Sequence, residues 1–403
     1  MALTRRIPPG FFLLRVCLAL VDLARTHTMK RRDMLGLAAG TLGLAACGEK
    51  AAPAAAAGSA GQAAPAKADK PIQWTMYTTW PRNFPGLGSG AAHLAESIGR
   101  LSGGRLTVKL YGAGERVPAL EVFDAVARGS AQMGHGAAYY WKGKAPAAPF
   151  FTCVPFGFTA AEQNAWLEFG GGNALWRELY AQFNLVPFAA GNTGTQMGGW
   201  FRKPVRSLDD LKGLKIRMPG LGGEVLARLG AATVNIPGGE IFTALSTGTI
   251  DATEWVGPYN DLAFGLHKAA KHYYYSGWHE PGPTLEAIVN KEAFDALPAD
   301  LQAIVEAACA QTNLRMQSEF VARNQQALDT LVNEHGVTLH AWPDAILTAL
   351  RDTAATVVAD FAAADPFAAK VYASYQAFRA QVLPYTRLAE EHFLRSRQPD
   401  GGA

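Results

Sequence analysis

The sequence predicts an α/β protein of two lobes, with a ligand cleft between the lobes and additional helices at the C-terminal end. A chain of 403 residues with 49% hydrophobic content can bury more than one core. From Pro71 onward, strand and helix patterns alternate, which is typical of parallel sheets joined by crossover helices. Glu121–Ser130 and Glu240–Thr249 share Glu, Phe, Ala and Gly in register, which indicates two lobes of like construction. Chance similarity between two amphipathic helices is the alternative explanation.

The individual elements follow from hydrophobic periodicity. Trp74–Trp80 has the pattern of a strand, a helical spacing runs from Ala91 to Leu101, and Leu106–Leu110 alternates as a strand does. The same rhythm resumes after Phe183. The strand candidates there are Leu185–Ala190, Leu214–Met218, Thr233–Ile236 and Ala252–Trp255.

A long helix is predicted after Pro366, ending near Pro384 and followed by a polar, helix-like run through Arg397. Its apolar residues recur at four- and three-residue steps and form one broad stripe. The stripe consists of Val371, Tyr375, Phe378, Val382 and Tyr385. Such a stripe must be covered, either by the chain's own lobes or by a second copy in a two-fold dimer. We expect the homodimer, because the lobes already have the helices they need.

Residues 1–47 are typical of an export signal, with the true start expected at Met29. A basic Lys30–Arg32 segment precedes an apolar run, Met34–Ala46, that is too short to span a bilayer as a mature helix. The paired arginines resemble a twin-arginine signal, and the ordinary Sec route stays open. Leu44–Cys47 resembles a lipobox, in which Cys47 would be lipidated and become the first mature residue. A plain cleaved signal is the alternative. The Ala/Gly/Pro-rich stretch 48–70 is predicted to be a flexible tether.

The four cysteines do not form a metal-binding set. Cys17 lies in the leader and Cys47 in the lipobox-like motif. Cys153 and Cys309 lie among apolar neighbours, so we expect buried free thiols. A disulfide between them stays open, since the sequence does not show that their Cα atoms come close enough.

Two strand ends carry the residues with the most distinctive chemistry. Arg217 ends the strand in Gly213–Gly220, and its planar fork of donors matches a carboxylate. Glu254 and Trp255 end the strand in Ile250–Pro258, and they provide hard oxygen ligands and an aromatic wall. The net charge of +3 is spread along the chain, which gives nucleic acid no basic patch to bind. The sequence therefore predicts a carboxylate clamp beside a cation site.

Other motifs have structural explanations. Gly220–Gly223 lacks the third glycine and the ribose-binding acid of a dinucleotide site, so we expect only a helix start. His135 has no second histidine at helical spacing and is expected to be structural. At least one of the aromatic residues 139–141 is expected to belong to the core. From local sequence alone, Arg217 would be a structural ion-pair partner, and Glu254 and Glu280 would be solvated loop acids.

Several long motifs give the chain a more specific resemblance. From about Gln73 to the C-terminal region, it resembles the solute-binding proteins of tripartite ATP-independent periplasmic (TRAP) transporters, most closely the branch that binds 2-oxo acids with a cation. The motifs are Thr79–Gly86, Gly134–Gly136, Tyr139–Lys142, Gly191–Gln196, Leu214–Pro219, Ala252–Pro258 and Gly277–Glu280. This resemblance implies a periplasmic-binding-protein-like fold.

The resemblance also implies roles for site residues. Arg217 would pair with the ligand carboxylate, Gln196 would contact the ligand and the cation region, and Trp255 would contact the ligand and lend its carbonyl to the cation. Glu254 and Glu280 would be carboxylate ligands of the metal. Tyr140, Asn192 and Tyr259 are further residues expected to line the cleft. The resemblance favours Na⁺, while charge counting leaves Ca²⁺ open.

The expected function is capture of a small 2-oxo monocarboxylate, similar to pyruvate, together with a cation, and its delivery to the membrane subunits of a TRAP permease. The expected location is the periplasm, with a lipid anchor at Cys47. The alternatives are another organic acid such as lactate with Ca²⁺, or an exported enzyme acting on a 2-oxo acid. No base is paired with a nucleophile and no cofactor motif is complete, which disfavours the enzyme. The expected lobes are 71–193 plus about 284–325 and 194–283 plus about 326–360, followed by a C-terminal extension, 361–403.

Overall fold

A computed structural model describes residues 70–397 of the chain. The predicted signal region, Cys47 and all of the predicted tether except Lys70 lie outside these residues. Between Lys70 and Arg397, no helix combines the length and the apolar character that a membrane crossing requires.

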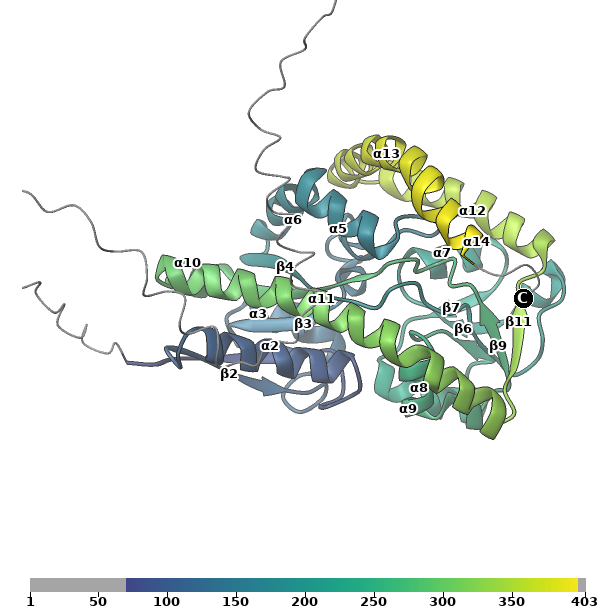
Figure 1. The fold of residues 1–403 in the computed structure, drawn as a ribbon, viewed down its shortest axis with the longest axis horizontal. Helices are drawn as coiled ribbons and strands as arrows, with labels where there is room; N and C mark the ends of the chain where they lie inside the picture. Colours follow the sequence, from purple (N-terminus) through teal and green to yellow (C-terminus); the bar gives the residue numbers. More distant parts are fainter. Residues whose placement is uncertain (1–69, 398–403) are drawn as a thin grey trace, which may run out of the picture. The chain divides into compact units, whose positions relative to one another are not determined.

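The chain forms two mixed sheets (Figure 1). Sheet A has the strand order β2-β1-β3-β10-β4, and sheet B has the order β11-β9-β5-β8-β6-β7. The strands of sheet A are β1 (Ile72–Thr78), β2 (Leu106–Tyr111), β3 (Met133–Gly136), β4 (Leu185–Asn192) and β10 (Thr284–Asn290). Those of sheet B are β5 (Gly199–Phe201), β6 (Lys215–Arg217), β7 (Ala232–Val234), β8 (Ala252–Thr253), β9 (His272–Tyr275) and β11 (Thr338–Ala341).

The two sheets share one strand arrangement. In sheet A, β1 lies between two parallel neighbours, β2 and β3. In sheet B, β6 likewise lies between the parallel strands β7 and β8. In sheet A, β10 follows β3 and runs antiparallel to both β3 and β4. In sheet B, β5 follows β8 in the strand order and runs antiparallel to both β8 and β9. The echo segments form helices α3 (Val122–Ala127) and α8 (Gly238–Thr247), which precede β3 and β8. This shared arrangement accounts for the internal echo in the sequence.

The prediction of wholly parallel sheets is wrong at β5 and β10. Both strands run antiparallel to their neighbours, and each enters its sheet directly from the other sheet, β5 after β4 and β10 after β9. The parallel direction of successive strands comes from a crossover helix that returns the chain to the same edge. A strand that arrives from the other sheet has no such connection, so its direction is not fixed by that rule.

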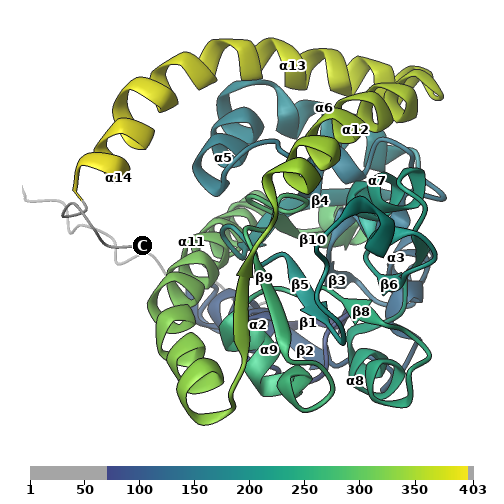
Figure 2. The ribbon, with the colours of Figure 1, turned by 90° about the vertical axis from the view of Figure 1, so that its right-hand side faces the viewer.

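Helices cover both sheets (Figures 1 and 2). The helix α11 (Ala299–Asp329) packs on α2 (Leu87–Leu101) and β4 at one end and on α9 (Pro258–Phe264) at the other, so it contacts elements of both halves. The other α-helices are α4 (Pro149–Thr152), α5 (Ala160–Phe169), α6 (Gly172–Ala181), α7 (Gly220–Arg228), α10 (Lys291–Asp295), α12 (Asp344–Ala363), α13 (Pro366–Thr386) and α14 (His392–Ser396). Single turns include η3 (Ala138–Trp141).

The C-terminal helix α13 crosses over α5 and α6 (Figure 2). Val371 and Tyr375 are buried in the chain's own core, and the Tyr375 hydroxyl accepts the Phe158 N–H at 2.9 Å. Phe378 and Val382 are partly buried against the same core, whereas Tyr385 is 72% exposed. Most of the apolar stripe is thus covered by the chain itself. The helix ends at Thr386, near the predicted end, and the predicted helix-like run continues as a π-helical turn (Arg387–Glu391) and α14.

Three predicted structural side chains are confirmed. Cys153 and Cys309 are buried free thiols, and burial raises the pKa of both. His135 is buried at the end of β3, where its Nδ1 accepts the Trp80 Nε1–H at 2.8 Å and its Nε2 lies 3.1 Å from the Ala190 carbonyl oxygen. Burial lowers the pKa of His135 to about 4, so the imidazole is neutral at pH 7.

Candidate functional site

The centre of the candidate site is the guanidinium group of Arg217, at the carboxyl end of β6. Arg217 pairs in register with Thr253 of the parallel strand β8, so Glu254 and Trp255 leave the sheet at the same edge. The Arg217 Nη1 donates to the Glu254 carbonyl oxygen at 3.1 Å and to its carboxylate. The guanidinium also lies 5.1 Å from the centre of the Trp255 ring. Both charged side chains are only 1% exposed.

A second acid joins this pair. Glu254, His279 and Glu280 each offer a ligand atom, and these atoms lie within 4.8 Å of one another. His279 Nε2 lies 3.3 Å from Glu254 Oε2. Burial raises the pKa of Glu280 well above its ordinary value, and the neighbouring charge of Glu254 raises it further. One arginine therefore faces two buried carboxyl groups, an arrangement that a cation would stabilise.

Gln196 and Glu280 come from the two segments that connect the sheets. Residues 193–198 lead from β4 to β5, and residues 276–283 lead from β9 to β10. The segments are joined by backbone hydrogen bonds, from Gln196 N–H to the Glu280 carbonyl at 3.1 Å and from Gly277 N–H to the Gln196 carbonyl at 2.9 Å. A Cβ atom at Gly277 would collide with that Gln196 carbonyl, so the close approach requires glycine. Glu280, one of the candidate cation ligands, thus lies where the chain passes between the two halves.

Unpaired polar atoms show what the cluster lacks. Among residues 70–397, no partner contacts the buried donors Arg217 Nη2 and Trp255 Nε1, or the buried oxygens Gln196 Oε1 and Glu280 Oε2. The Gln196 amide is oriented by its Nε2–H, which donates to Thr193 Oγ1 at 3.2 Å. Buried polar atoms are rarely left without partners. Unpaired donors suit an anion and unpaired oxygens suit a cation, so the residues present fit both groups.

The three further cleft candidates lie in different environments. Burial raises the pKa of Tyr140 to about 12, and the charges of Arg217 and Glu254 also act on this phenol, which places it beside the cluster. Asn192 is buried, but its amide donates to the Gly282 carbonyl at 3.2 Å and accepts the Gly194 N–H at 2.8 Å, so it holds the connections between the sheets. The Tyr259 hydroxyl donates to Glu319 on α11 at 2.9 Å.

Two residues of the cluster were not assigned to the site from sequence. His279 precedes Glu280 within the Gly277–Glu280 motif, and this adjacency was the available signal. Tyr139 lies close enough to Glu280 to oppose the rise in its pKa. Its place one residue before Tyr140 gave no hint, because consecutive aromatic residues also occur in ordinary cores.

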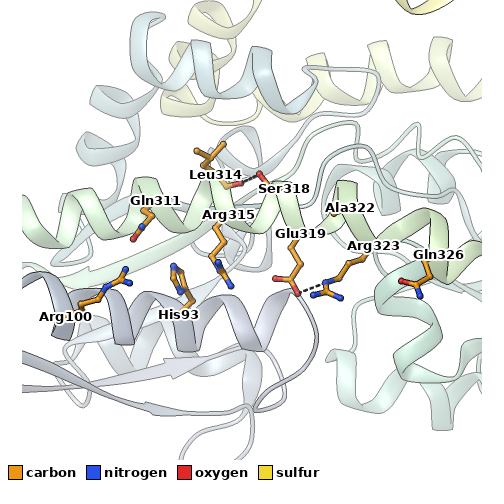
Figure 3. Close-up of a pocket in the computed structure, with 10 residues that line it drawn as sticks. All are labelled: His93, Arg100, Gln311, Leu314, Arg315, Ser318, Glu319, Ala322, Arg323 and Gln326. Carbon is orange, nitrogen blue, oxygen red and sulfur yellow. Dashed lines mark hydrogen bonds and ion pairs between the residues drawn. The ribbon is translucent and has the colours of Figure 1, made fainter. Parts of the chain in front are cut away.

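A groove between α2 and α11 lies outside the cluster (Figure 3). Its volume is about 710 Å³, and Arg100, His93 and Arg315 point toward one another at one end. The carboxylate of Glu319 lies 3.7 Å from Arg323 and also accepts the Tyr259 hydroxyl. The groove is open, and it contains none of the residues that the sequence predicts for ligand binding. We therefore place the candidate site at Arg217.

Comparison with known proteins identifies the family. The model of bacterial extracellular solute-binding proteins, family 7 (DctP), matches residues 77–365. The chain belongs to this family. Its resemblance to the TRAP solute-binding proteins and its predicted fold class are confirmed, and the family assignment points to a binding protein of a transport system.

Three relatives of this solute-binding protein are known to bind 2-oxo acids. The chain is 42% identical to a monocarboxylate 2-oxoacid-binding periplasmic protein of Nostoc sp., over 92% of this chain and 100% of that one. A TRAP periplasmic solute binding protein from Pseudoalteromonas atlantica, solved with bound sodium and pyruvate, is 45% identical with a TM-score of 0.79, covering 82% and 100% of the two chains. Another, from Colwellia psychrerythraea with bound calcium and pyruvate, is 42% identical with a TM-score of 0.79, covering 81% and 100%.

The binding protein has two further buried acids, Glu286 and Asp261, which accept hydrogen bonds from aromatic side chains. Glu286 on β10 accepts hydrogen bonds from the Trp141 indole and, at 2.8 Å, from the Tyr180 hydroxyl. Asp261 on α9 accepts from the Trp200 indole at 2.8 Å and the Tyr273 hydroxyl at 2.7 Å. Burial raises the pKa of each to about 7, although these hydrogen bonds oppose the rise.

The raised pKa of Glu286 predicts a specific pH dependence of stability. The folded protein holds a proton on Glu286 up to about pH 7, whereas the unfolded chain releases it near the ordinary value of 4.5. The contribution of Glu286 to the free energy of unfolding is therefore fully present below pH 4.5 and is lost as the pH rises through 7. The free energy falls by at most about 1.4 kcal/mol per pH unit. Urea unfolding of the wild-type protein and Glu286→Gln, in chelator without ligand, should show their free-energy difference changing across this window. Parallel pH profiles would contradict the assignment.

Proposed function

We propose that this protein is an extracytoplasmic solute-binding protein that captures a small 2-oxo monocarboxylate, similar to pyruvate, together with a cation, and delivers it to a TRAP-type permease. One observation carries the proposal: a single buried cluster contains both donors and oxygens that have no hydrogen-bond partner. The donors are Arg217 Nη2 and Trp255 Nε1, and the oxygens are Gln196 Oε1 and Glu280 Oε2. The relatives solved with pyruvate and a cation support it.

In this proposal the organic acid binds to Arg217. Its Nη1 is already bonded to Glu254, which leaves Nη2 for the ligand carboxylate. Trp255, stacked against the same guanidinium, provides an apolar wall and an indole donor. Gln196 would contact the ligand and the cation region. Tyr140 is proposed to line the cleft, whereas the contacts of Asn192 and Tyr259 favour a supporting role.

The cation is proposed to bind to Glu254, Glu280 and the Trp255 carbonyl, with sodium favoured over calcium. Bound there, it would supply positive charge that holds the two carboxylates and the ligand together. Arg217, the two glutamates and one monocarboxylate leave two negative charges, so Na⁺ leaves one and Ca²⁺ leaves none. Sodium in the relative with 45% identity supports the choice of Na⁺.

Location, lobe division and assembly complete the proposal. The family assignment supports a periplasmic location, and a lipid anchor at Cys47 rests on the sequence motif. The proposed lobes have the boundaries given above, and the strands of each lobe belong to one sheet, A or B, which supports the division.

A two-fold dimer would use the C-terminal segment that the chain leaves uncovered, where Tyr385, Leu388, Phe393 and Leu394 are exposed. Light scattering on the exported form tests it, and a monomer mass at tens of micromolar would refute it.

The anion clamp is tested with Arg217→Lys. Lysine keeps the charge but loses the planar fork, so the Kd for pyruvate should rise roughly tenfold or more while the circular dichroism spectrum stays unchanged. Isothermal titration calorimetry measures the Kd. Arg228→Lys, at an exposed arginine that pairs with Asp360, is the matched control and should leave the Kd unchanged. Equal affinity of Arg217→Lys and wild type, or product formed from pyruvate during the titration, would contradict the proposal.

The cation site is tested by removing metal. After chelation and dialysis into choline buffer, pyruvate should bind more weakly, and added Na⁺ or Ca²⁺ should restore affinity, because ligand and cation share one cluster. Glu280→Gln should reduce this dependence on added cation. Glu96→Gln, at an exposed acid on α2, is the control and should keep it. The same pyruvate affinity with and without cation would remove the metal from the proposal.

A further inference from the structure

We infer that Glu286 and Asp261 are positioning residues, each of which fixes one wall of the ligand site from behind. The inference rests on the proposed function, because it assumes that the cluster around Arg217 binds the ligand. Neither carboxyl group belongs to that cluster. Both are buried, Glu286 completely and Asp261 to within 1% of its surface.

Glu286 holds the wall formed by η3. The Trp141 indole, the last residue of η3, donates to one oxygen of Glu286, and the Tyr180 hydroxyl donates to the other. Within η3, the Tyr140 ring lies 6.0 Å from Trp141 and 4.8 Å from Tyr139. Tyr139 in turn lies beside Glu280. Glu286 thus fixes the orientation of a row of aromatic rings that ends at the candidate cation site.

Asp261 holds the wall formed by the segment after β8. Its Oδ2 accepts from the Trp200 indole at 2.8 Å and the Tyr273 hydroxyl at 2.7 Å. Its Oδ1 accepts the Val256 N–H at 3.3 Å. Val256 directly follows Trp255, so this bond restrains the peptide chain next to the residue that faces both Arg217 and the ligand.

The two carboxyl groups occupy related places in the two halves. In sheet A, the segment after β3 is bonded to the antiparallel strand β10, with Trp141 as donor and Glu286 as acceptor. In sheet B, the helix after β8 is bonded to the antiparallel strand β5, with Trp200 as donor and Asp261 as acceptor. The tryptophan lies on the segment in sheet A and on the strand in sheet B, but in both sheets a tryptophan–carboxyl hydrogen bond joins the segment to the strand. Each joins the segment that carries a wall of the site to the strand beside it.

A purely structural role does not explain this repetition. An apolar side chain of similar volume would fill the same space without the desolvation cost of a carboxyl group. Networks whose polar atoms are all paired hold side chains in one orientation, which an apolar contact does less well. Glu162 on α5 provides the comparison, because it is also buried but bonds Thr159 and Thr386 in a helix cap, away from Arg217.

The test compares Glu286→Gln, Asp261→Asn and the control Glu162→Gln in the full protein. An amide oxygen can accept from one former donor, while the amide NH₂ faces the other. The pyruvate Kd at 25 °C and about pH 8, above the pKa of about 7 of both carboxyls, should therefore rise roughly tenfold in the first two variants. The control should lower the melting temperature without changing the Kd. If Glu286→Gln does not fold, Trp141→Phe removes the same bond from the donor side, with the same expected rise. An unchanged Kd in the folded site variants, or an equal rise in all three variants, would overturn the inference.

Indole NMR separates this inference from the proposed function. In ¹⁵N-tryptophan-labelled protein without ligand, the Trp141 Nε1–H signal should shift and exchange faster in Glu286→Gln, while that of Trp200 stays unchanged. Asp261→Asn should show the reverse. Assignment uses Trp141→Phe and Trp200→Phe. If the wild type binds no 2-oxo acid, the proposed function fails, yet the indole signals still show whether these carboxyls orient the walls. Undisturbed indole signals would overturn the inference by themselves.

Discussion

The buried charge of Arg217 is the constraint on which the rest of the site depends. A guanidinium group removed from water destabilises the fold unless carboxylate and carbonyl oxygens surround it. Glu254 provides both, through its side chain and its backbone, and the ring of Trp255 covers the face of the guanidinium. The second buried acid, Glu280, exceeds what one arginine can neutralise. Either protonation of Glu280 or an added cation would neutralise this excess negative charge, and the unpaired donors of Arg217 and Trp255 suit an added anion.

The fold brings these groups together by two different routes. Arg217 and Glu254 come from the carboxyl ends of adjacent parallel strands, the usual place for ligand groups in α/β sheets. Gln196, His279 and Glu280 come from the two segments by which the chain passes between the sheets. In two-lobed binding proteins, such connecting segments absorb the change when lobes close. A cation bound there would act directly on the connections, which gives ligand capture a physical link to the arrangement of the two halves.

Sequence patterns could not predict several features of the fold, and each has an identifiable physical reason. Strands β5, β8 and β11 are two to four residues long, too short for alternation to be recognised, and only β8 follows a clear strand signal. The antiparallel direction of β10 depends on where the chain has been before it enters sheet A. Pro384 removes one backbone hydrogen bond from α13, yet the chain stays helical beyond it, in a π-helical turn (Arg387–Glu391) and α14, so a proline in this pattern does not mark where the helical run stops.

The sequence by itself determined the α/β alternation, the kinship of the two halves, the buried thiols and the chemical character of the site. These follow from local periodicity and from motifs in which neighbouring residues carry the information, such as Arg217 at the end of a strand. Only the tertiary structure decided which side chains meet. In the folded chain, His279 and Tyr139 lie beside Glu280, and the Tyr259 hydroxyl bonds Glu319 on α11. The Asn192 amide bonds the Gly282 carbonyl in the segment between β9 and β10. The direction of a side chain depends on packing between distant segments, which local sequence patterns do not contain.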